Sequence, residues 1–319
     1  MRERVLVTGG CGFIGAHLVR ALIAEGRSVS VLDDLSTGSA DRLPAGVDVT
    51  LHRGSVCDPA AVREAARGAT RVLHLAGVVG MRLAAMERER AYAVAVDGTR
   101  AVLAETGEIP AVLFSSSAVY GMTGRAPVAE DTPVDPSALL AYDGGLPGYA
   151  TGKRALETQG LEASSRGRSV LVVRPFNVVG PGQSARYGMV LPTLVARALA
   201  GEPLEVYDDG AQTRCFSEVG AWSRVLLRVM DVPAAWREGT NVVNLGSAQS
   251  ASIGEVARAV LAITGSRSSL VHVPYSQVFP GRQDVRARVP DVTRVESWLG
   301  PVAWPGLDQV LRALVASAR

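Results

Sequence analysis

The chain has 319 residues, of which 47% are hydrophobic and 20% are charged, which is the composition of a folded protein that can bury a large core. Its 33 basic and 31 acidic residues give a formal charge of +2, so the sequence lacks the basic surface of a nucleic-acid-binding protein. The apolar stretches are far shorter than the roughly 20 residues that cross a bilayer, so we expect no membrane partner.

The first predicted element is a strand at residues 4–8, followed by a glycine-rich turn and a segment with apolar residues at helical spacing. Further strands are predicted at 28–32, 47–51, 71–75, 111–115 and 169–174, and helices at 59–67, 83–105 and 149–165. Repeated alternation of strands and helices predicts an α/β fold built on a Rossmann doubly wound parallel sheet.

After residue 175 the pattern loosens into connections rich in glycine and proline. Helices are predicted near 188–201, 218–231, 252–265 and 307–317. We therefore predict a first domain at 1–175 and a smaller mixed α/β lobe at 176–319, with late segments able to return to the first sheet.

Three glycines, Gly9, Gly12 and Gly15, stand between the first strand and the first helix. In such a turn they allow a tight bend, close approach of the backbone to a pyrophosphate, and packing of the helix on the strand. Asp33 ends the second strand, where a carboxylate binds the adenosine ribose and repels the 2′-phosphate of NADP. With no neighbouring arginine to receive that phosphate, the spacing predicts NAD. The alternative is that Asp33 or Asp34 is an ordinary solvated turn residue.

Lys153 is the only lysine, since the other 32 of the 33 basic residues are arginine. Tyr149 precedes it by four residues, so the phenol and the amine share one helical face. A nearby ammonium and a positive nicotinamide can lower the pKa of a phenol from about 10 to near 7, so that it can take a proton from an alcohol. The alternative is an exposed helical pair without a catalytic role.

A run of serines at 115–117 ends a predicted strand, at the sheet edge where α/β proteins bind ligands. A serine there can hydrogen-bond a reacting oxygen beside Tyr149, although turn chemistry is the alternative. The three cysteines and four histidines show no ligand spacing, so we predict reduced thiols and no metal site. Cys215 and His74 are expected in the core.

Together these segments resemble the extended short-chain dehydrogenase/reductases, in the branch of nucleotide-sugar epimerases, dehydratases and decarboxylases. The resemblance covers nearly the whole chain and is carried by 8–15, 33–38, Asp58, 74–77, 115–121, Tyr149 with Lys153, 174–181 and 212–216. It implies a catalytic set of Ser116, Tyr149 and Lys153.

The resemblance also implies the binding residues. NAD would contact Tyr149, Lys153 and a set drawn from the first half of the chain, namely Gly9, Gly12, Phe13, Ile14, Gly15, Asp33, Asp34, Ser36, Thr37, Gly38, Asp58, Leu75, Ala76 and Gly77. A UDP-sugar would contact Ser117, Asn177, Tyr187, Arg214, Arg282 and Arg288.

In this family NAD oxidises the sugar at C4, and the ketone makes the next step possible. Segments 186–192, 274–275 and 281–291 look most like UDP-glucuronate decarboxylases, which make UDP-xylose. Those enzymes carry an acid two residues after the catalytic hydroxyl, where this chain has Ala118. The resemblance therefore implies conversion of UDP-glucuronate to UDP-xylose, UDP-4-keto-pentose or both.

Three alternatives remain beside that reading. A UDP-hexose or UDP-hexuronate 4-epimerase fits the same residues, whereas Ala118 disfavours 4,6-dehydration because loss of water needs a positioned acid. A non-enzymatic dinucleotide-binding regulator is disfavoured by the complete set of Ser116, Tyr149 and Lys153.

The chain departs from the family at Ala95, where an asparagine is usual, and at 137–148, which is longer and richer in glycine. The resemblance implies a homodimer formed through the helices at 83–105 and 149–165. Because the first residues lead directly into an apolar run without the features of a secretory signal, we expect a cytoplasmic protein.

Overall fold

The centre of the molecule is a parallel sheet of seven strands, described here from a computed structural model that covers residues 3–46, 48–124, 126–279 and 284–319. In spatial order the strands are β11 (Val242–Leu245), β6 (Val170–Pro175), β5 (Ala111–Phe114), β4 (Arg71–His74), β1 (Arg4–Thr8), β2 (Ser28–Asp33) and β3 (Val49–Arg53). The order reverses between β1 and β4, and such a switch point opens a ligand crevice at the carboxyl ends of the strands. The predicted Rossmann fold is confirmed.

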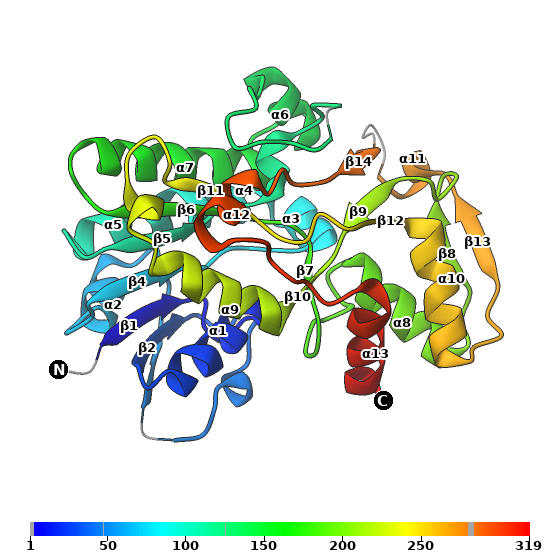
Figure 1. The fold of residues 1–319 in the computed structure, drawn as a ribbon, viewed down its shortest axis with the longest axis horizontal. Helices are drawn as coiled ribbons and strands as arrows, with labels where there is room; N and C mark the ends of the chain where they lie inside the picture. The colour runs from blue at the N-terminus through cyan, green and yellow to red at the C-terminus, as the bar shows by residue number, and fades with distance from the viewer. Residues whose placement is uncertain (1–2, 47, 125, 280–283) are drawn as a thin grey trace.

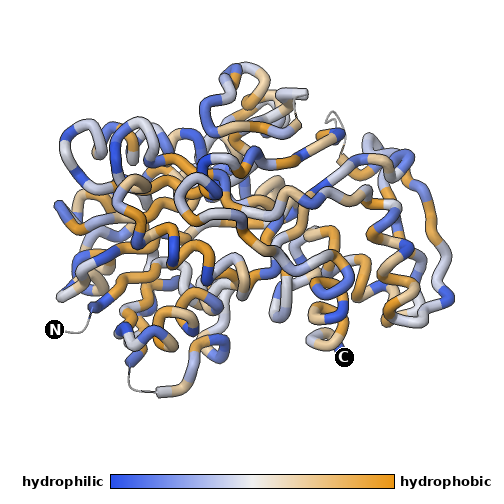
Figure 2. Tube along the Cα trace, viewed as in Figure 1, coloured by the Kyte–Doolittle hydropathy of each residue, from blue (hydrophilic) through white to orange (hydrophobic). Residues whose placement is uncertain are grey.

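Side chains alternate along each strand, so the sheet presents apolar side chains on both faces. Helices cover both of these faces. In β1, Val5 and Val7 belong to one buried cluster and Leu6 to the other. The first face carries α1 (Phe13–Ala24), α9 (Val219–Met230) and α12 (Thr293–Leu299), and the second carries α2 (Pro59–Ala65), α5 (Thr99–Glu105) and α7 (Tyr149–Ser165). Figure 2 shows hydrophobic residues concentrated along the central strands between these layers.

The helical stretch predicted for 83–105 is present, but it is interrupted at one residue and contains a π-helical turn. The chain forms α3 (Met81–Met86), α4 (Arg88–Ala93), a π-helical turn η2 (Val94–Gly98) and α5. Glu87, with φ −108° and ψ 44°, leaves the helical region and separates α3 from α4. The helix continues from η2 into α5 through Gly98, which has φ −62° and ψ −44°. A β-carbon on Gly98 would lie only 2.7 Å from a methyl of Val56, so this glycine allows the close approach of a neighbouring loop.

A second lobe lies to the right in Figure 1, around α8 (Val190–Ala200), α10 (Ile253–Thr264) and α13 (Leu307–Ala318). These helices share a buried core with β8 (Leu204–Tyr207), which pairs with β13 (Leu270–Val273). Short strands complete the lobe and its connections, namely β7 (Val178–Val179), β9 (Thr213–Cys215), β10 (Ser217–Glu218), β12 (Ser250–Ser252) and β14 (Ala287–Arg288). The chain crosses the predicted boundary at residue 175 more than once, since α9 and β11 belong to the layers of the first sheet.

The glycine-rich segment at 137–148 contains a short helix, α6 (Pro136–Tyr142), which projects at the top of Figure 1 beside α7. Asp135 caps it by accepting a hydrogen bond from the Ser137 N–H, and Pro136 occupies its first turn. The remaining helical pieces are α11 (Tyr275–Val278) and three 3₁₀ turns, η1 (Ala40–Arg42), η3 (Ser117–Tyr120) and η4 (Pro233–Trp236). Among the described residues, no helix combines the length and hydrophobicity required to span a bilayer.

Candidate active site

A cavity of about 780 Å³ opens at the carboxyl ends of β1, β2, β4 and β5. Its wall is formed by the glycine turn after β1, the ends of the neighbouring strands, the first turns of α7, and residues of the second lobe. Its size is in the range of small-molecule sites, and its place is the one that the strand order predicts.

The glycine turn has the backbone that a dinucleotide requires. Gly9 has φ +69°, and a β-carbon there would lie 2.8 Å from the amide nitrogen of Ala76. A β-carbon on Gly15 would collide with the carbonyl oxygen of Gly9. Helix α1 starts after Gly12 without a side-chain cap, so its first N–H groups are available to phosphate oxygens at the cavity wall. These features fit the pyrophosphate of NAD.

Asp33 lies in the cavity wall at the end of β2. Its carboxylate accepts hydrogen bonds from the backbone N–H groups of Cys11, at 2.9 Å, and Leu35, at 2.8 Å. Burial raises its pKa, and these two hydrogen bonds act in the opposite direction. Each carboxylate oxygen has further acceptor capacity, so Asp33 fits a ribose hydroxyl.

The expectation that Asp33 has no arginine nearby is wrong. Arg42, at the end of η1, also lines the cavity, and its charge lowers the pKa of Asp33. Arg42 follows Asp33 by only nine residues, and the 3₁₀ turn brings it back toward the carboxyl end of β2. The preference for NAD therefore rests on the Asp33 carboxylate alone.

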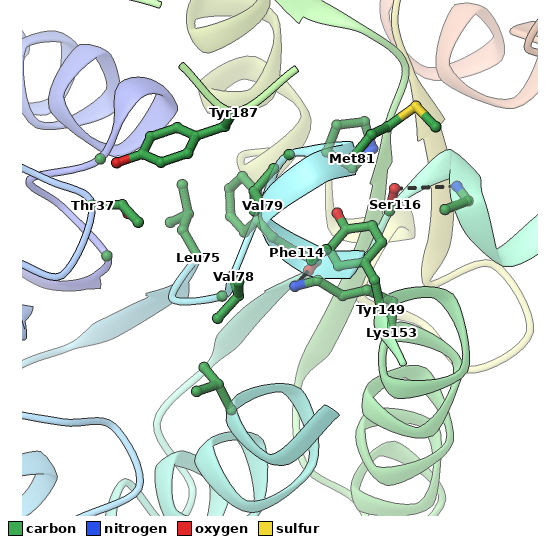
Figure 3. A pocket seen from close by; sticks show the side chains of 18 of the residues that line it. Thr37, Leu75, Val78, Val79, Met81, Phe114, Ser116, Tyr149, Lys153 and Tyr187 are labelled. Carbon is green, nitrogen blue, oxygen red and sulfur yellow. Dashed lines mark hydrogen bonds between the residues drawn. The ribbon is translucent and has the colours of Figure 1, made fainter. Parts of the chain in front are cut away.

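Ser116, Tyr149 and Lys153 meet in the same cavity, as Figure 3 shows. Ser116 follows β5, and the other two lie on the first turns of α7. Lys153 is almost fully buried, and its Nζ donates a hydrogen bond to the main-chain oxygen of Phe114 at 2.7 Å. The three predicted catalytic residues are thus brought together by one helix packing against one strand end.

In the protein without cofactor, the pKa of the Tyr149 phenol is not lowered as the pairing with Lys153 predicts. Burial raises the pKa of Tyr149, and the Ser116 hydroxyl offsets part of that rise. Burial also lowers the pKa of Lys153 to about 8, and its hydrogen bond is directed at Phe114. Lys153 alone therefore does not lower the pKa of the phenol below its ordinary value, and the positive nicotinamide of bound NAD is left as the group that can do so.

A buried ion pair next to Ser116, Tyr149 and Lys153 was not predicted from the sequence. Glu157 is completely buried one helical turn after Lys153. It accepts a hydrogen bond from the Ser115 hydroxyl at 2.6 Å and pairs with Arg174 at 2.7 Å. These contacts hold α7 against the end of β5, where Ser116 lies.

The second lobe contributes Asn177, Tyr187 and Arg214 to the cavity wall. Asn177 has φ +37°, and its side-chain amide donates a hydrogen bond to the Cys215 carbonyl at 2.8 Å. Arg214 pairs with Asp284 at 2.7 Å, so its charge is already balanced.

Arg288 lies at the same end of the cavity as Ser116 and Tyr149, and only 5% of it is exposed. Its guanidinium donates hydrogen bonds to two main-chain oxygens, those of Ser117 at 2.9 Å and Gly121 at 2.6 Å. Within the described part of the chain no carboxylate forms an ion pair with it. Arg282, the other predicted arginine of this segment, lies outside the described residues.

Most of the predicted NAD-binding residues line the cavity, but Gly38 and Asp58 do not. Gly38 packs against Cys11, where a β-carbon would lie 2.7 Å from the backbone. Asp58 is exposed and caps α2 by accepting a hydrogen bond from the Ala60 N–H at 2.9 Å. One oxygen of its carboxylate therefore has a structural role.

Several lining residues were not predicted, namely Arg42, Tyr142, Gln183, Tyr275 and Asp284. They lie on turns and short helices without a periodic pattern, so only the folded chain reveals them. Cys215 and His74 are buried as expected, and burial raises the pKa of Cys215 to about 12. His74 hydrogen-bonds Thr8 at 2.8 Å and Thr99 at 3.1 Å.

Comparisons with known proteins agree with this geometry. The model of the NAD dependent epimerase/dehydratase family matches residues 5–246. The chain is 33% identical to a UDP-N-acetyl-alpha-D-glucosaminuronate decarboxylase of Bacillus cytotoxicus, over 93% of this chain and 91% of that protein. It is 29% identical to UDP-glucuronic acid decarboxylase 1 of Xenopus tropicalis, over 94% of this chain and 68% of that protein.

Among solved structures, the fold is similar to MoeE5 in complex with UDP-glucuronic acid and NAD. The TM-score is 0.83 and the sequences are 29% identical, over 99% of this chain and 98% of that one.

Proposed function

The chain belongs to the NAD dependent epimerase/dehydratase family, and from that premise we propose that it oxidises C4 of a UDP-linked uronate and then removes the C5 carboxylate. With UDP-glucuronate the product is UDP-xylose, UDP-4-keto-pentose or both. The similarity to two decarboxylases of UDP-linked uronates supports this proposal.

Arg288 is the observation that carries the proposal. A buried charge is costly unless an anion balances it, and the described carboxylates leave this guanidinium without an ion pair. Because Arg288 lies beside Ser117, next to the catalytic serine, a sugar carboxylate at C5 can supply the missing anion close to C4. A neutral hexose would leave the charge unbalanced.

The residues of the trio have distinct parts in the proposed reaction. When bound, NAD supplies the nicotinamide ring that accepts the hydride from C4. Tyr149 takes the proton of the C4 hydroxyl, and Ser116 holds the same oxygen by a hydrogen bond. Lys153 fixes the geometry through Phe114 and adds positive charge when protonated. The C4 ketone then accepts the electron pair that remains when carbon dioxide leaves C5.

A UDP-sugar 4-epimerase is the second candidate, and Ala118 is the observation that favours it. Epimerisation returns hydride to the other face of C4 and needs no proton at C5, so it does not require the acid that the decarboxylases carry at this position. The family description itself includes epimerases.

Arg288→Gln tests the uronate-binding role of Arg288. Loss of a charged hydrogen-bonding group should weaken binding of UDP-glucuronate by roughly tenfold to a hundredfold, and binding of UDP-glucose much less. Arg286→Gln is the matched control, because Arg286 is exposed and pairs with Asp209 outside the cavity wall. Equal weakening of both nucleotide sugars by Arg288→Gln would contradict a role in recognising the carboxylate.

We also propose that residues 1–175, with the later segments that return to the first sheet, bind NAD, and that the rest of 176–319 binds the sugar nucleotide. The protein is a homodimer that pairs through the helices at 83–105 and 149–165, which light scattering during size-exclusion chromatography would test. It resides in the cytoplasm, which subcellular fractionation would test.

A further inference from the structure

The Tyr142 hydroxyl is a polar group in the cavity wall that the mechanism above does not use. Tyr142 ends α6, and it lines the cavity together with Ser116 and Tyr149. Its ring packs against the buried cluster that contains Ala118, and Tyr149 packs against the same cluster. Among the described residues the Tyr142 hydroxyl has no hydrogen-bond partner. It is also not fully buried. The hydroxyl is therefore available to a bound molecule.

Asp143 fixes the position of Tyr142 relative to Tyr149. One oxygen of the Asp143 carboxylate accepts a hydrogen bond from the Ala150 N–H at 3.0 Å. The other accepts hydrogen bonds from the N–H of Thr151 at 2.8 Å and from its hydroxyl at 2.7 Å. The residue after Tyr142 is thus tied to the helical turn that begins with Tyr149. Consequently, the two phenols are held on neighbouring parts of one wall.

Positive charge lies beside the Tyr142 ring. The guanidinium carbon of Arg288 is 6.0 Å from the centre of the ring. A cation over an aromatic face is attracted by the ring electrons, so this contact keeps the Tyr142 ring beside the guanidinium. Arg288 is also the group to which we assign the substrate carboxylate, so Tyr142 lies near the sugar carbon from which carbon dioxide leaves.

We propose that Tyr142 delivers the proton to C5 after decarboxylation, in place of the acid that related decarboxylases carry at position 118. The inference rests on the proposed function. As the bond from C5 to the carboxylate breaks, its electron pair moves into the C4–C5 bond and the ketone becomes an enolate. The enolate then collapses to the ketone as C5 takes the phenolic proton of Tyr142. The resulting phenolate regains a proton from water.

The experiment compares wild type, Tyr142→Phe and a control in deuterated water, with UDP-glucuronate as substrate. Deuterium at C5 of UDP-xylose is located by NMR, and C4 oxidation is followed in a single turnover by NADH absorbance. Tyr92→Phe is the control, because Tyr92 packs against α7 near Gly152 and does not line the cavity.

In wild type and in Tyr92→Phe the label should occupy one of the two C5 positions, because a fixed donor protonates one face. In Tyr142→Phe, C4 oxidation should be unchanged, product release should slow at least about tenfold, and the label should occupy both positions because water supplies the proton. The phenylalanine keeps the ring and its packing, so this variant preserves the wall.

Single-position labelling at the wild-type rate in Tyr142→Phe would overturn the assignment, while carbon dioxide release by the same enzyme would leave the proposed function intact. Scrambled label in Tyr92→Phe would also overturn it, because the effect would then follow from disturbing α7. If wild type keeps the carboxylate on its product, the proposed function fails and this inference fails with it.

Discussion

The Nζ atom of Lys153 lies 2.7 Å from the main-chain oxygen of Phe114 and donates a hydrogen bond to it. This contact joins α7 to the end of β5, and it places Tyr149 beside Ser116 on the cavity wall (Figure 3). One amine therefore serves two purposes. It fixes the helix against the strand, and it brings a positive charge into a buried site.

Replacing Tyr149 with phenylalanine should lower kcat at least about a hundredfold, because the hydroxyl that takes the C4 proton is lost. The ring would still fill its place, so folding and retention of NAD should be unchanged. Turnover of UDP-glucuronate and the cofactor content of the purified variant are the measurements. Turnover close to that of wild type would remove Tyr149 from the catalytic set.

The buried ammonium of Lys153 should make stability depend on pH. Its pKa is about 8 in the folded chain, against an ordinary value of 10.5. Between these values the unfolded chain holds the proton and the folded chain releases it, so stability rises with pH in this window. Below pH 8 the full cost of burying the charge remains.

Lys153→Met measures that cost. From pH 8 to pH 10.5, the free energy of unfolding of wild type should rise by about 3 kcal/mol relative to that of the variant. Denaturant unfolding of the two cofactor-free proteins gives this difference, in which other titrating groups cancel. A difference that stays constant over this range would mean that Lys153 is not desolvated.

His74 predicts a change of the same sign at lower pH. Burial lowers its pKa to about 3, against an ordinary value of 6.5, and both ring nitrogens hydrogen-bond threonine hydroxyls. As the pH falls below 6.5 the unfolded chain takes up a proton that the folded chain refuses, so stability falls. Between pH 6.5 and pH 4, wild type should lose about 3 kcal/mol more than His74→Gln. Parallel losses would show that the imidazole is protonated in place.

The Asp33 carboxylate should select NAD over NADP, since it would repel a 2′-phosphate. Cofactor extracted from purified wild-type protein should be mainly NAD. Asp33→Asn should bind NADP at least about tenfold more tightly than wild type, because the repulsion is removed while Arg42 remains in the cavity wall. Recovery of mainly NADP from wild type would show that Arg42 outweighs Asp33.

Much of this architecture can be predicted from the sequence because local patterns carry it. The β1 strand, the glycine turn and the Tyr149 helix each combine a hydrophobic period with a characteristic residue spacing, and the structure has all three in place. The interruption at Glu87 and the π-helical turn that ends at Gly98 could not be predicted from the hydrophobic period. The close approach at Gly98 depends on Val56, a residue far away in the chain.

The residues of the cavity wall also fall into a group that the sequence predicts and a group that it does not. Ser116, Tyr149 and Lys153 lie in sequence motifs, whereas Tyr142 and Arg42 reach the cavity through a short helix and a 3₁₀ turn. Asp58 is a different case, because a residue that the resemblance assigned to NAD caps α2 and does not line the cavity. Tertiary contacts decide such positions.

The most direct test of the account is the fate of the C5 carboxylate. UDP-glucuronate labelled with ¹³C at C6 is incubated with the NAD-loaded enzyme, and the gas and the nucleotide product are analysed by mass spectrometry. We predict that the label leaves as carbon dioxide and that the product is UDP-xylose or UDP-4-keto-pentose. A product that retains the labelled carboxylate, with only C4 inverted, would contradict decarboxylation and establish the epimerase.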